Sequence, residues 1–171
     1  MFDSLRADLA ANRGRPHIQT FFALRHTAVK LRHGHPLIRR TFGAVATIAY
    51  RSYSLFVLSI DIPVSTELGH GIAIHHGFGL VINDRARIGS GVTLRHSTTI
   101  GARDDGSAAP VVGDAVDIGA GVTLLGPITI GSGSRIGSGS VVISDVPPFC
   151  TAVGNPARLL EARRTPQADD D

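Results

Sequence analysis

From Leu68 to Val142 the chain places an aliphatic residue at nearly every sixth position. Glycine directly follows most of these residues, and a small or branched residue stands four places after most of them. A period of six excludes an amphipathic helix, whose apolar face recurs every 3.6 residues. It predicts a parallel β-helix, in which each unit forms a short strand and a turn, and stacked units share one core. The aliphatic positions are Leu68, Ile74, Ile82, Ile88, Leu94, Ile100, Val112, Ile118, Leu124, Ile130, Ile136 and Val142.

The number of repeat units predicts the number of coils. The repeat is also interrupted at two places. Three units close one triangular coil, so these units predict about four coils. Two residues are inserted between Ile74 and Ile82, around Gly77-Phe78-Gly79. At position 106, where an aliphatic residue is due, Gly106 stands in the polar run 102–110. We expect this run to leave the coil as a loop, and loops on rigid scaffolds often carry binding groups.

Residues 1–60 show helical spacing instead of the six-residue period. Their apolar residues predict one helix ending near 12–14, a second closed by Gly34 and Pro36, and a third between Leu37 and Val57. We expect these helices to cap the open end of the β-helix, where apolar side chains and strand edges are exposed. Residues 153–164 are expected to cap the opposite end. The chain thus divides into an N-terminal helical cap segment (1–60), a β-helix domain (61–150) and a C-terminal cap with an acidic tail (151–171).

The net charge of +3 is unevenly distributed. Residues 1–60 hold nine Lys or Arg against two Asp, whereas residues 61–171 hold eight against twelve acidic residues. The basic segment is interpreted either as a solvated helical face or as a surface that contacts anionic membrane lipid. No aromatic or helix-turn-helix arrangement accompanies the charge, so nucleic acid is not expected as a partner.

Composition also bears on the compartment. Residues 1–15 are polar and lack the apolar stretch of a signal peptide, and no uncharged apolar run reaches the ~18 residues of a membrane span. The single cysteine, Cys150, excludes an internal disulfide framework. We therefore expect a cytoplasmic protein, with the basic N-terminus as the surface for any contact with the inner membrane leaflet.

The residues best placed for chemistry are a histidine pair at the first interruption. His75 and His76 cannot both face the core, so at least one is exposed. An exposed imidazole, with an ordinary pKa of about 6.5, can take a proton from a hydroxyl at neutral pH. A carboxylate on its other nitrogen would hold the tautomer. Asp61 stands fifteen residues before His76, close to one coil, and we predict that it orients His76 as a general base.

Four segments resemble the serine acetyltransferase group of hexapeptide-repeat acyltransferases: DIP (61–63), LGHGI (68–72), HGFGLVI (76–82) and VPPFCTAVGNPAR (146–158). The resemblance implies an all-β fold, a left-handed parallel β-helix of hexapeptide repeats with a short N-terminal helical segment. It implies a homotrimer with active sites between subunits. It further implies that His76, oriented by Asp61, activates an acceptor hydroxyl for direct attack on acetyl-CoA, with no metal and no acyl-enzyme.

By position, the resemblance implies a CoA groove lined by six residues. Small residues let the pantetheine arm lie along backbone groups, and arginine pairs with the CoA phosphates. Glycine and alanine are equally what tight coil corners require for packing alone. The implied lining residues are Gly101, Ala102, Ala120, Arg135, Ser138 and Arg158.

Two departures from serine acetyltransferases favour a different acceptor. Those enzymes end the loop in Asp-Arg-His-Pro, whose Arg and His help to hold the amino acid, whereas 107–110 here is Ser-Ala-Ala-Pro. The residue before the catalytic histidine is normally Asp, a partner for the substrate ammonium, and here it is His75. Losing these groups removes much of the basis for amino-acid specificity.

The whole chain is more similar to a second branch, the short exopolysaccharide acetyltransferases of the colanic-acid type. The shared segments are SLRAD (4–8), IHHG (74–77), VIN (81–83) and RHSTTIG (95–101). This resemblance implies a sugar hydroxyl as acceptor, with His75, His96 and Arg103 on the acceptor or CoA side. We therefore predict an acetyl-CoA-dependent O-acetyltransferase acting on a saccharide, with serine O-acetylation in cysteine biosynthesis as the alternative.

Two other functional classes of protein could use the same β-helix scaffold. The γ-class carbonic anhydrases also coil left-handed and bind zinc through three histidines. His70 and His75 have a compatible spacing, but the third ligand should come from an earlier coil, where this chain is predicted to be helical. A catalytically silent scaffold would need only the fold. The closing GNPAR motif and the His76–Asp61 pair favour acyl transfer over both.

Overall fold

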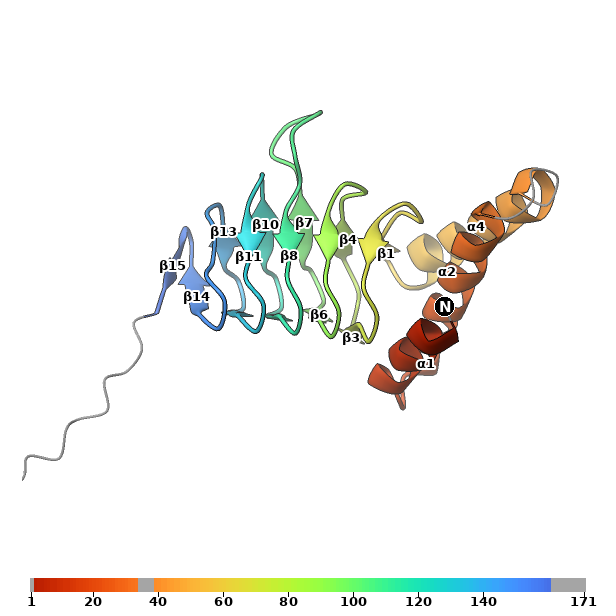
Figure 1. The fold of residues 1–171 in the computed structure, drawn as a ribbon, viewed down its shortest axis with the longest axis horizontal. Helices are drawn as coiled ribbons and strands as arrows, with labels where there is room; N and C mark the ends of the chain where they lie inside the picture. Colours follow the sequence, from red (N-terminus) through yellow and green to blue (C-terminus); the bar gives the residue numbers. More distant parts are fainter. Residues whose placement is uncertain (1, 34–38, 161–171) are drawn as a thin grey trace, which may run out of the picture.

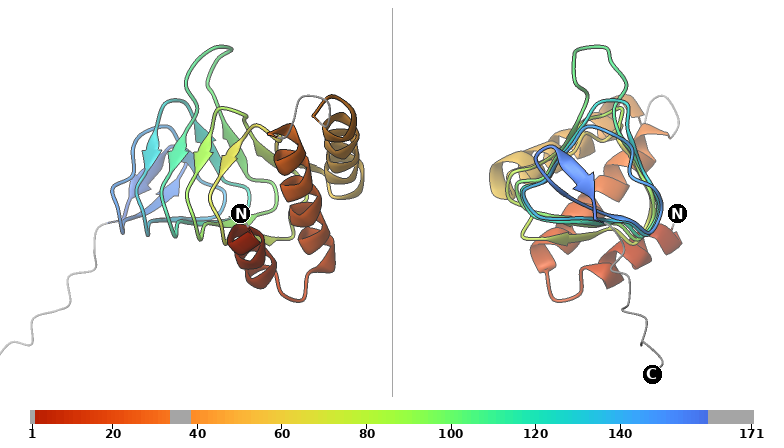
Figure 2. Two further views of the ribbon diagram at one scale, coloured as in Figure 1. Left: turned by 45° about the vertical axis from the view of Figure 1, so that its right-hand side comes forward. Right: turned by 90° about the vertical axis from the view of Figure 1, so that its left-hand side faces the viewer.

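The computed structural model describes residues 2–33 and 39–160. Short strands form three sheets that face one another across a common core, so each coil is triangular in cross-section (Figures 1 and 2). All strand pairs are parallel except the last, β14 with β15. The parallel β-helix expected from the six-residue period, with the left hand that the resemblance implies, is confirmed.

Each sheet takes one strand from each coil. Sheet A contains β1 (Ile60–Asp61), β4 (Leu80–Ile82), β7 (Thr99–Gly101), β10 (Thr123–Leu125) and β13 (Val141–Val142). Sheet B contains β2 (Glu67–Leu68), β5 (Arg87–Ile88), β8 (Val111–Val112) and β11 (Thr129–Ile130). Sheet C contains β3 (Ala73–His75), β6 (Thr93–Arg95), β9 (Asp117–Ile118), β12 (Arg135–Ile136), β14 (Thr151–Gly154) and β15 (Ala157–Leu159).

The solenoid has about five coils, one more than the period predicts. Sheet A alone has five strands. The first coil begins at Ile60, which pairs with Leu80 although its unit lacks the regular spacing. The last coil continues past Val142 through a single bridge between Ile130 and Val146 and closes with β14. Irregular units at both ends therefore complete coils that the strict repeat does not reveal.

The core consists of the two inward positions of each unit. Of the twelve aliphatic repeat positions all are buried except Leu68, which is half-buried. The glycines that follow them lie where neighbouring coils approach closely. A Cβ on Gly119 would lie 2.5 Å from the backbone nitrogen of Ser138 in the next coil. The repeated glycine is thus a packing requirement of the corner.

Helical segments cover the open end of the first coil (Figure 1). They are α1 (Phe2–Ala11), α2 (Pro16–Arg32) and α4 (Ala44–Ser52), the last flanked by π-helical turns η1 (Arg39–Gly43) and η2 (Tyr53–Val57). The three helical stretches expected from apolar spacing are therefore present. The predicted break at Gly34 and Pro36 lies outside the described residues.

Polar side chains of these helices bond the backbone groups that the first coil leaves unpaired. From α1, Asp8 Oδ1 accepts a hydrogen bond from Ile72 N (3.0 Å). Asn12 donates to Ile72 O (2.7 Å) and accepts from Ile74 N (2.9 Å). A buried strand edge must be satisfied in some way, and here helix side chains take the place of a further strand.

The same arrangement continues around the coil. Arg25 of α2 donates to Thr66 O (2.6 Å), and Tyr50 of α4 donates to Ile62 O (2.7 Å). Ser54 of η2 donates to Ile60 O. The first coil is therefore capped by α1 and the turn after it at sheet C, by α2 beside sheet B, and by α4 with η2 at sheet A.

The buried hydroxyl of Tyr50 is expected to make the protein less stable at alkaline pH. Its side chain is fully buried, and burial raises the pKa of its hydroxyl from 10.0 to about 12. Between pH 10 and 12 the unfolded chain has lost this proton while the folded chain still holds it, so unfolding becomes more favourable as pH rises. We expect a loss of roughly 2 to 3 kcal/mol across this range.

Urea unfolding at pH 8 and at pH 10 to 12 measures this loss. Tyr50→Phe should be less stable at pH 8 but should lack the Tyr50 part of the alkaline decline. Tyr53→Phe, which removes the other tyrosine, should leave the decline in place. An equal decline in all three proteins would contradict the assignment.

The opposite end closes with a hairpin. After β14 the chain turns back at Gly154, and β15 pairs antiparallel with β14. Leu160 N donates to Thr151 O (2.8 Å). In the view along the solenoid, β15 lies across the end of the triangle (Figure 2).

Candidate active site

The corner between sheet C and sheet A carries four of the predicted site residues in successive coils. Parallel pairing of β3, β6, β9 and β12 aligns the residues that follow these strands. Backbone hydrogen bonds between the coils continue the alignment around the corner. The structure therefore brings together, in chain order, His76, His96, Ala120 and Ser138.

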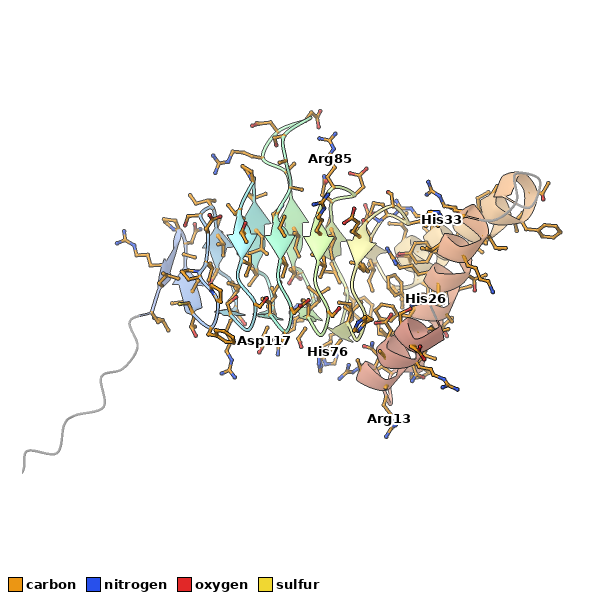
Figure 3. All side chains as sticks on the ribbon, in the orientation of Figure 1. Arg13, His26, His33, His76, Arg85 and Asp117 are labelled. Carbon is orange, nitrogen blue, oxygen red and sulfur yellow. The ribbon has the colours of Figure 1, made fainter. Side chains whose placement is uncertain are left out.

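His76 is exposed at this corner, on the lower side of the solenoid in Figure 3. Its backbone is left-handed, with φ of 51°, a conformation uncommon for residues other than glycine but more frequent for His than for most. The next residue, Gly77, is buried, and a Cβ there would lie 2.6 Å from Ile60 Cδ1. The two-residue insertion thus folds Gly77 inward and leaves the imidazole outside.

Asp61 lies on the sheet that adjoins this corner. It stands beside Val81, five residues after His76, because β1 pairs with β4. Its carboxylate accepts a hydrogen bond from Arg51 at 2.7 Å and is 44% exposed. The hydrogen bond expected between Asp61 and His76 is not present among the described residues. Asp61 and His76 lie on either side of one corner. Their roles as orienting carboxylate and general base stay predictions.

His75 lies in a cationic environment that the sequence does not reveal. Arg15, from the turn before α2, lies 3.0 Å from His75 Nδ1, and Arg95 is the next residue along sheet C. Burial, followed by the charges of Arg15 and Arg95, lowers the pKa of His75. The neutral form of His75 is therefore favoured, and the nearby positive charges do not suit an ammonium group on a substrate.

A shallow groove of about 430 Å³ runs along the outer face of sheet C. Arg95 and Asp117 form an ion pair at its edge. The groove includes two of the residues implied for CoA, Arg135 and Ser138, and Figure 3 shows Asp117 on the same side of the solenoid as His76. A groove that contains Arg135 on the same face of the solenoid suits a phosphate-bearing substrate.

The other predicted residues lie elsewhere on the triangle. Gly101 ends β7, and Ala102 and Arg103 begin the loop between sheet A and sheet B, which projects from the solenoid (Figures 1 and 2). A Cβ on Gly126 of the next coil would lie 3.7 Å from Arg103 Nε. His70 lies at the third corner, between sheets B and C. The histidines and the loop, neighbours in sequence, therefore do not form one cluster within a single chain, because the width of sheet A separates the loop from His76.

Arg158 lies on β15, beyond the last complete coil, and is exposed. Among the described residues no group of three or more His, Cys, Asp or Glu side chains could hold a metal ion. His70 and His75, considered for zinc, lie at opposite ends of the segment that contains β3. No described helix is long and apolar enough to cross a membrane.

Comparison with known proteins identifies the family. No family model matches the chain. The serine acetyltransferase of Helicobacter pylori is 34% identical over 141 residues, which cover 81% of this chain and 82% of that protein. The chain belongs to the serine acetyltransferase family. The Bacillus subtilis serine acetyltransferase is 38% identical over 128 residues, 74% of this chain and 58% of that protein.

Some members of this family are much longer. The chain spans only 29% of the mitochondrial serine acetyltransferase 3 of Arabidopsis thaliana, although it is 45% identical over 114 residues, 66% of this chain. The proteins named here are serine acetyltransferases, so the comparisons support that branch and not the exopolysaccharide branch favoured by the sequence segments.

Solved structures of the serine acetyltransferase family share the fold. The soybean apoenzyme superposes with a TM-score of 0.75 at 37% identity and covers 92% of this chain and 68% of its own. A Brucella abortus serine acetyltransferase in complex with coenzyme A has a TM-score of 0.76 at 28% identity, with coverage of 93% and 67%.

Sequence reasoning missed three residues around the site: Arg15, Arg51 and Asp117. Arg15 and Arg51 come from the helical segment, sixty and ten residues away from the side chains that they contact. Neither belongs to a repeat or motif, so no local signal marks them. Asp117 is an outward-facing strand residue, and its ion pair with Arg95 follows from coil stacking, so a register argument could have found it.

Proposed function

We propose that the chain is an acetyl-CoA-dependent O-acetyltransferase with His76 as its general base. The observation that carries the proposal is the corner itself, where an exposed histidine heads a column continued by Ala120 and Ser138 beside the sheet C groove. Membership of the serine acetyltransferase family supports the same reaction class.

The reaction needs one proton transfer and one displacement. The neutral imidazole of His76 takes the proton of the acceptor hydroxyl, and the oxygen attacks the thioester carbonyl carbon. The C–S bond breaks, the thiolate of CoA leaves, and the imidazolium returns the proton to it. An exposed imidazole at neutral pH can hold the proton between these steps.

We infer that the complete site forms between two copies of the chain. His76 and the loop that begins at Ala102 lie at different corners of the triangle, so one copy supplies the base and its neighbour supplies the loop. A homotrimer would repeat this junction three times. Apolar residues exposed on the helical segment, Phe42, Val45, Ile48 and Phe56, offer further surface for assembly. Light scattering of the purified protein tests the trimer.

L-serine is the first acceptor to test, because the family is named for it and a soybean relative is described as complexed with serine. One observation favours a second candidate, a saccharide hydroxyl. At the position before His76 the ammonium group of serine would meet His75 with Arg15 and Arg95, and Asp117 on the same face is already paired with Arg95. We therefore expect serine to bind weakly, with a high KM and a retained kcat.

Thiol release from acetyl-CoA, measured separately with L-serine and with a panel of sugars, decides between the two. Release with serine supports serine O-acetylation. Release only with a sugar assigns the saccharide acceptor. If no acceptor causes release and acetyl-CoA does not bind, the proposed function is wrong.

A further inference from the structure

A second hollow lies outside the candidate active site, between helix α2 and strand β2. Two adjoining cavities, of about 530 and 430 Å³, together form what we term the α2 furrow. Both are lined by Arg25, Val29, His33 and Leu68. The larger one also reaches α1 and the corner at His70.

One of the four residues that the two cavities share, Arg25, is an unusual residue to find buried. Arg25 is 8% exposed, and among the described residues no carboxylate lies within 4 Å of its guanidinium. It donates a hydrogen bond to Thr66 O (2.6 Å) and interacts with the Tyr50 hydroxyl, while its Nε is buried and has no hydrogen-bond partner in the described part of the chain. Buried charges are normally paired, because an unpaired charge loses its hydration without compensation.

The acidic residues that line the furrow already have partners. Asp8, in the larger cavity, accepts hydrogen bonds from His26 Nε2 (2.9 Å) and from Ile72 N (3.0 Å). Glu67, in the smaller cavity, pairs with Arg87 at 3.2 Å. Glu67 is therefore engaged by Arg87, and Asp8, whose charge acts on Arg25 at longer range, forms no ion pair with it.

Further cationic and titratable side chains line the furrow. Lys30 and His33 come from the face of α2 that carries Arg25 and His26, and His70 comes from the first coil. Figure 3 shows His26 and His33 along α2. Arg32 lines the smaller cavity. The apolar wall consists of Phe22, Val29 and Leu68.

We propose that the α2 furrow binds a small organic molecule that carries a phosphate group. The phosphate lies against Arg25, with His33 and His70 as further donors, and the uncharged body of the ligand lies on Val29 and Leu68. Guanidinium groups pair with phosphate through short, charge-assisted hydrogen bonds. Bound phosphate would supply the close anionic partner that Arg25 lacks among the described residues.

The α2 furrow is distinct from the candidate active site. His70 and His76 stand at two corners of the first coil, at opposite ends of the segment that contains β3. No described residue that lines the furrow also lines the sheet C groove. The proposal does not depend on the acetyltransferase reaction, and it can be tested without acetyl-CoA.

The test uses the full chain, with inorganic phosphate and glycerol 3-phosphate as probes and sodium chloride at matched ionic strength as reference. Calorimetric titration gives the Kd, and thermal unfolding gives the shift in Tm. We expect both probes to raise Tm above the chloride value, and glycerol 3-phosphate to bind more tightly. Arg25→Met should weaken binding at least about tenfold, as expected for loss of a charge-assisted hydrogen bond.

Arg25 also caps the first coil, so a second variant keeps the test independent of folding. His33→Ala with His70→Ala removes two exposed side chains of the furrow and should weaken binding severalfold without changing Tm in chloride. His17→Ala, on α2 but outside the furrow, should bind normally. Arg135→Gln, in the sheet C groove, should also bind normally.

Three results would overturn the proposal. The first is no effect of either probe beyond that of chloride. The second is normal binding in both Arg25→Met and the double histidine variant. The third is loss of binding in Arg135→Gln, which would assign the phosphate to the candidate CoA groove.

Discussion

Replacing His76 with alanine is expected to lower kcat at least about 10²-fold, because the acceptor hydroxyl loses its general base. Binding of CoA should be unchanged, because the sheet C groove with Arg135 and Ser138 stays intact. The measurements are thiol release from acetyl-CoA under saturating acceptor and a calorimetric titration with CoA.

The left-handed backbone at His76 calls for a matched control. Alanine adopts a φ of 51° less readily than histidine, so part of any loss in His76→Ala could come from a rearranged corner. His76→Asn tolerates this conformation and also lacks the base, and it should lose as much activity as His76→Ala. His17→Ala, an exposed histidine on α2, should be fully active. Near-normal turnover in His76→Asn would show that the base is elsewhere.

The same two measurements, made on Asp61→Asn, test the role of Asp61. Its carboxylate pairs with Arg51 and makes no hydrogen bond to His76 among the described residues. If Asp61 orients the imidazole only when the site is assembled, Asp61→Asn lowers kcat with little change in CoA affinity. If Asp61 serves only to hold Arg51, the variant loses stability and keeps its turnover.

The fold could be predicted because the period of six leaves little choice. Each unit has two inward side chains and a glycine where coils approach, and the burial of Ile74, Leu94 and Ile118 at successive levels of sheet C follows directly. The extra coil could not be predicted, because its first unit is recognised only through the pairing of Ile60 with Leu80. That pairing depends on the helices that cover the other edge of β1.

The site could be predicted only in part. The insertion marked the corner of His76, since two extra residues must leave a regular coil. The loop beginning at Ala102 lies near the histidines in sequence, but the structure places it at another corner, because each strand turns the chain by one side of the triangle. The contacts of Arg15 and Arg51 join helices to coils across the cap, and no periodic signal encodes them.

The cap also gives the prediction with the largest expected effect on stability, at Asn12. Its side chain is fully buried and bonds both Ile72 O and Ile74 N at the open edge of sheet C. Leucine has a similar size but makes neither bond, so Asn12→Leu leaves a buried carbonyl and a buried amide unpaired. At 1 to 3 kcal/mol for each, we expect a loss of about 3 kcal/mol.

Thermal unfolding and hydrogen exchange measure this effect together. For a domain of this size, about 3 kcal/mol corresponds to a fall in Tm of roughly 6 to 12 °C. The amide of Ile74 should exchange much faster in Asn12→Leu, because Asn12 Oδ1 is its acceptor. Arg13→Ala, at the neighbouring exposed position, should change neither quantity. If Ile74 stays protected in Asn12→Leu, the helices cover the first coil by apolar packing alone, and the polar side chains that replace a strand contribute little to holding them there.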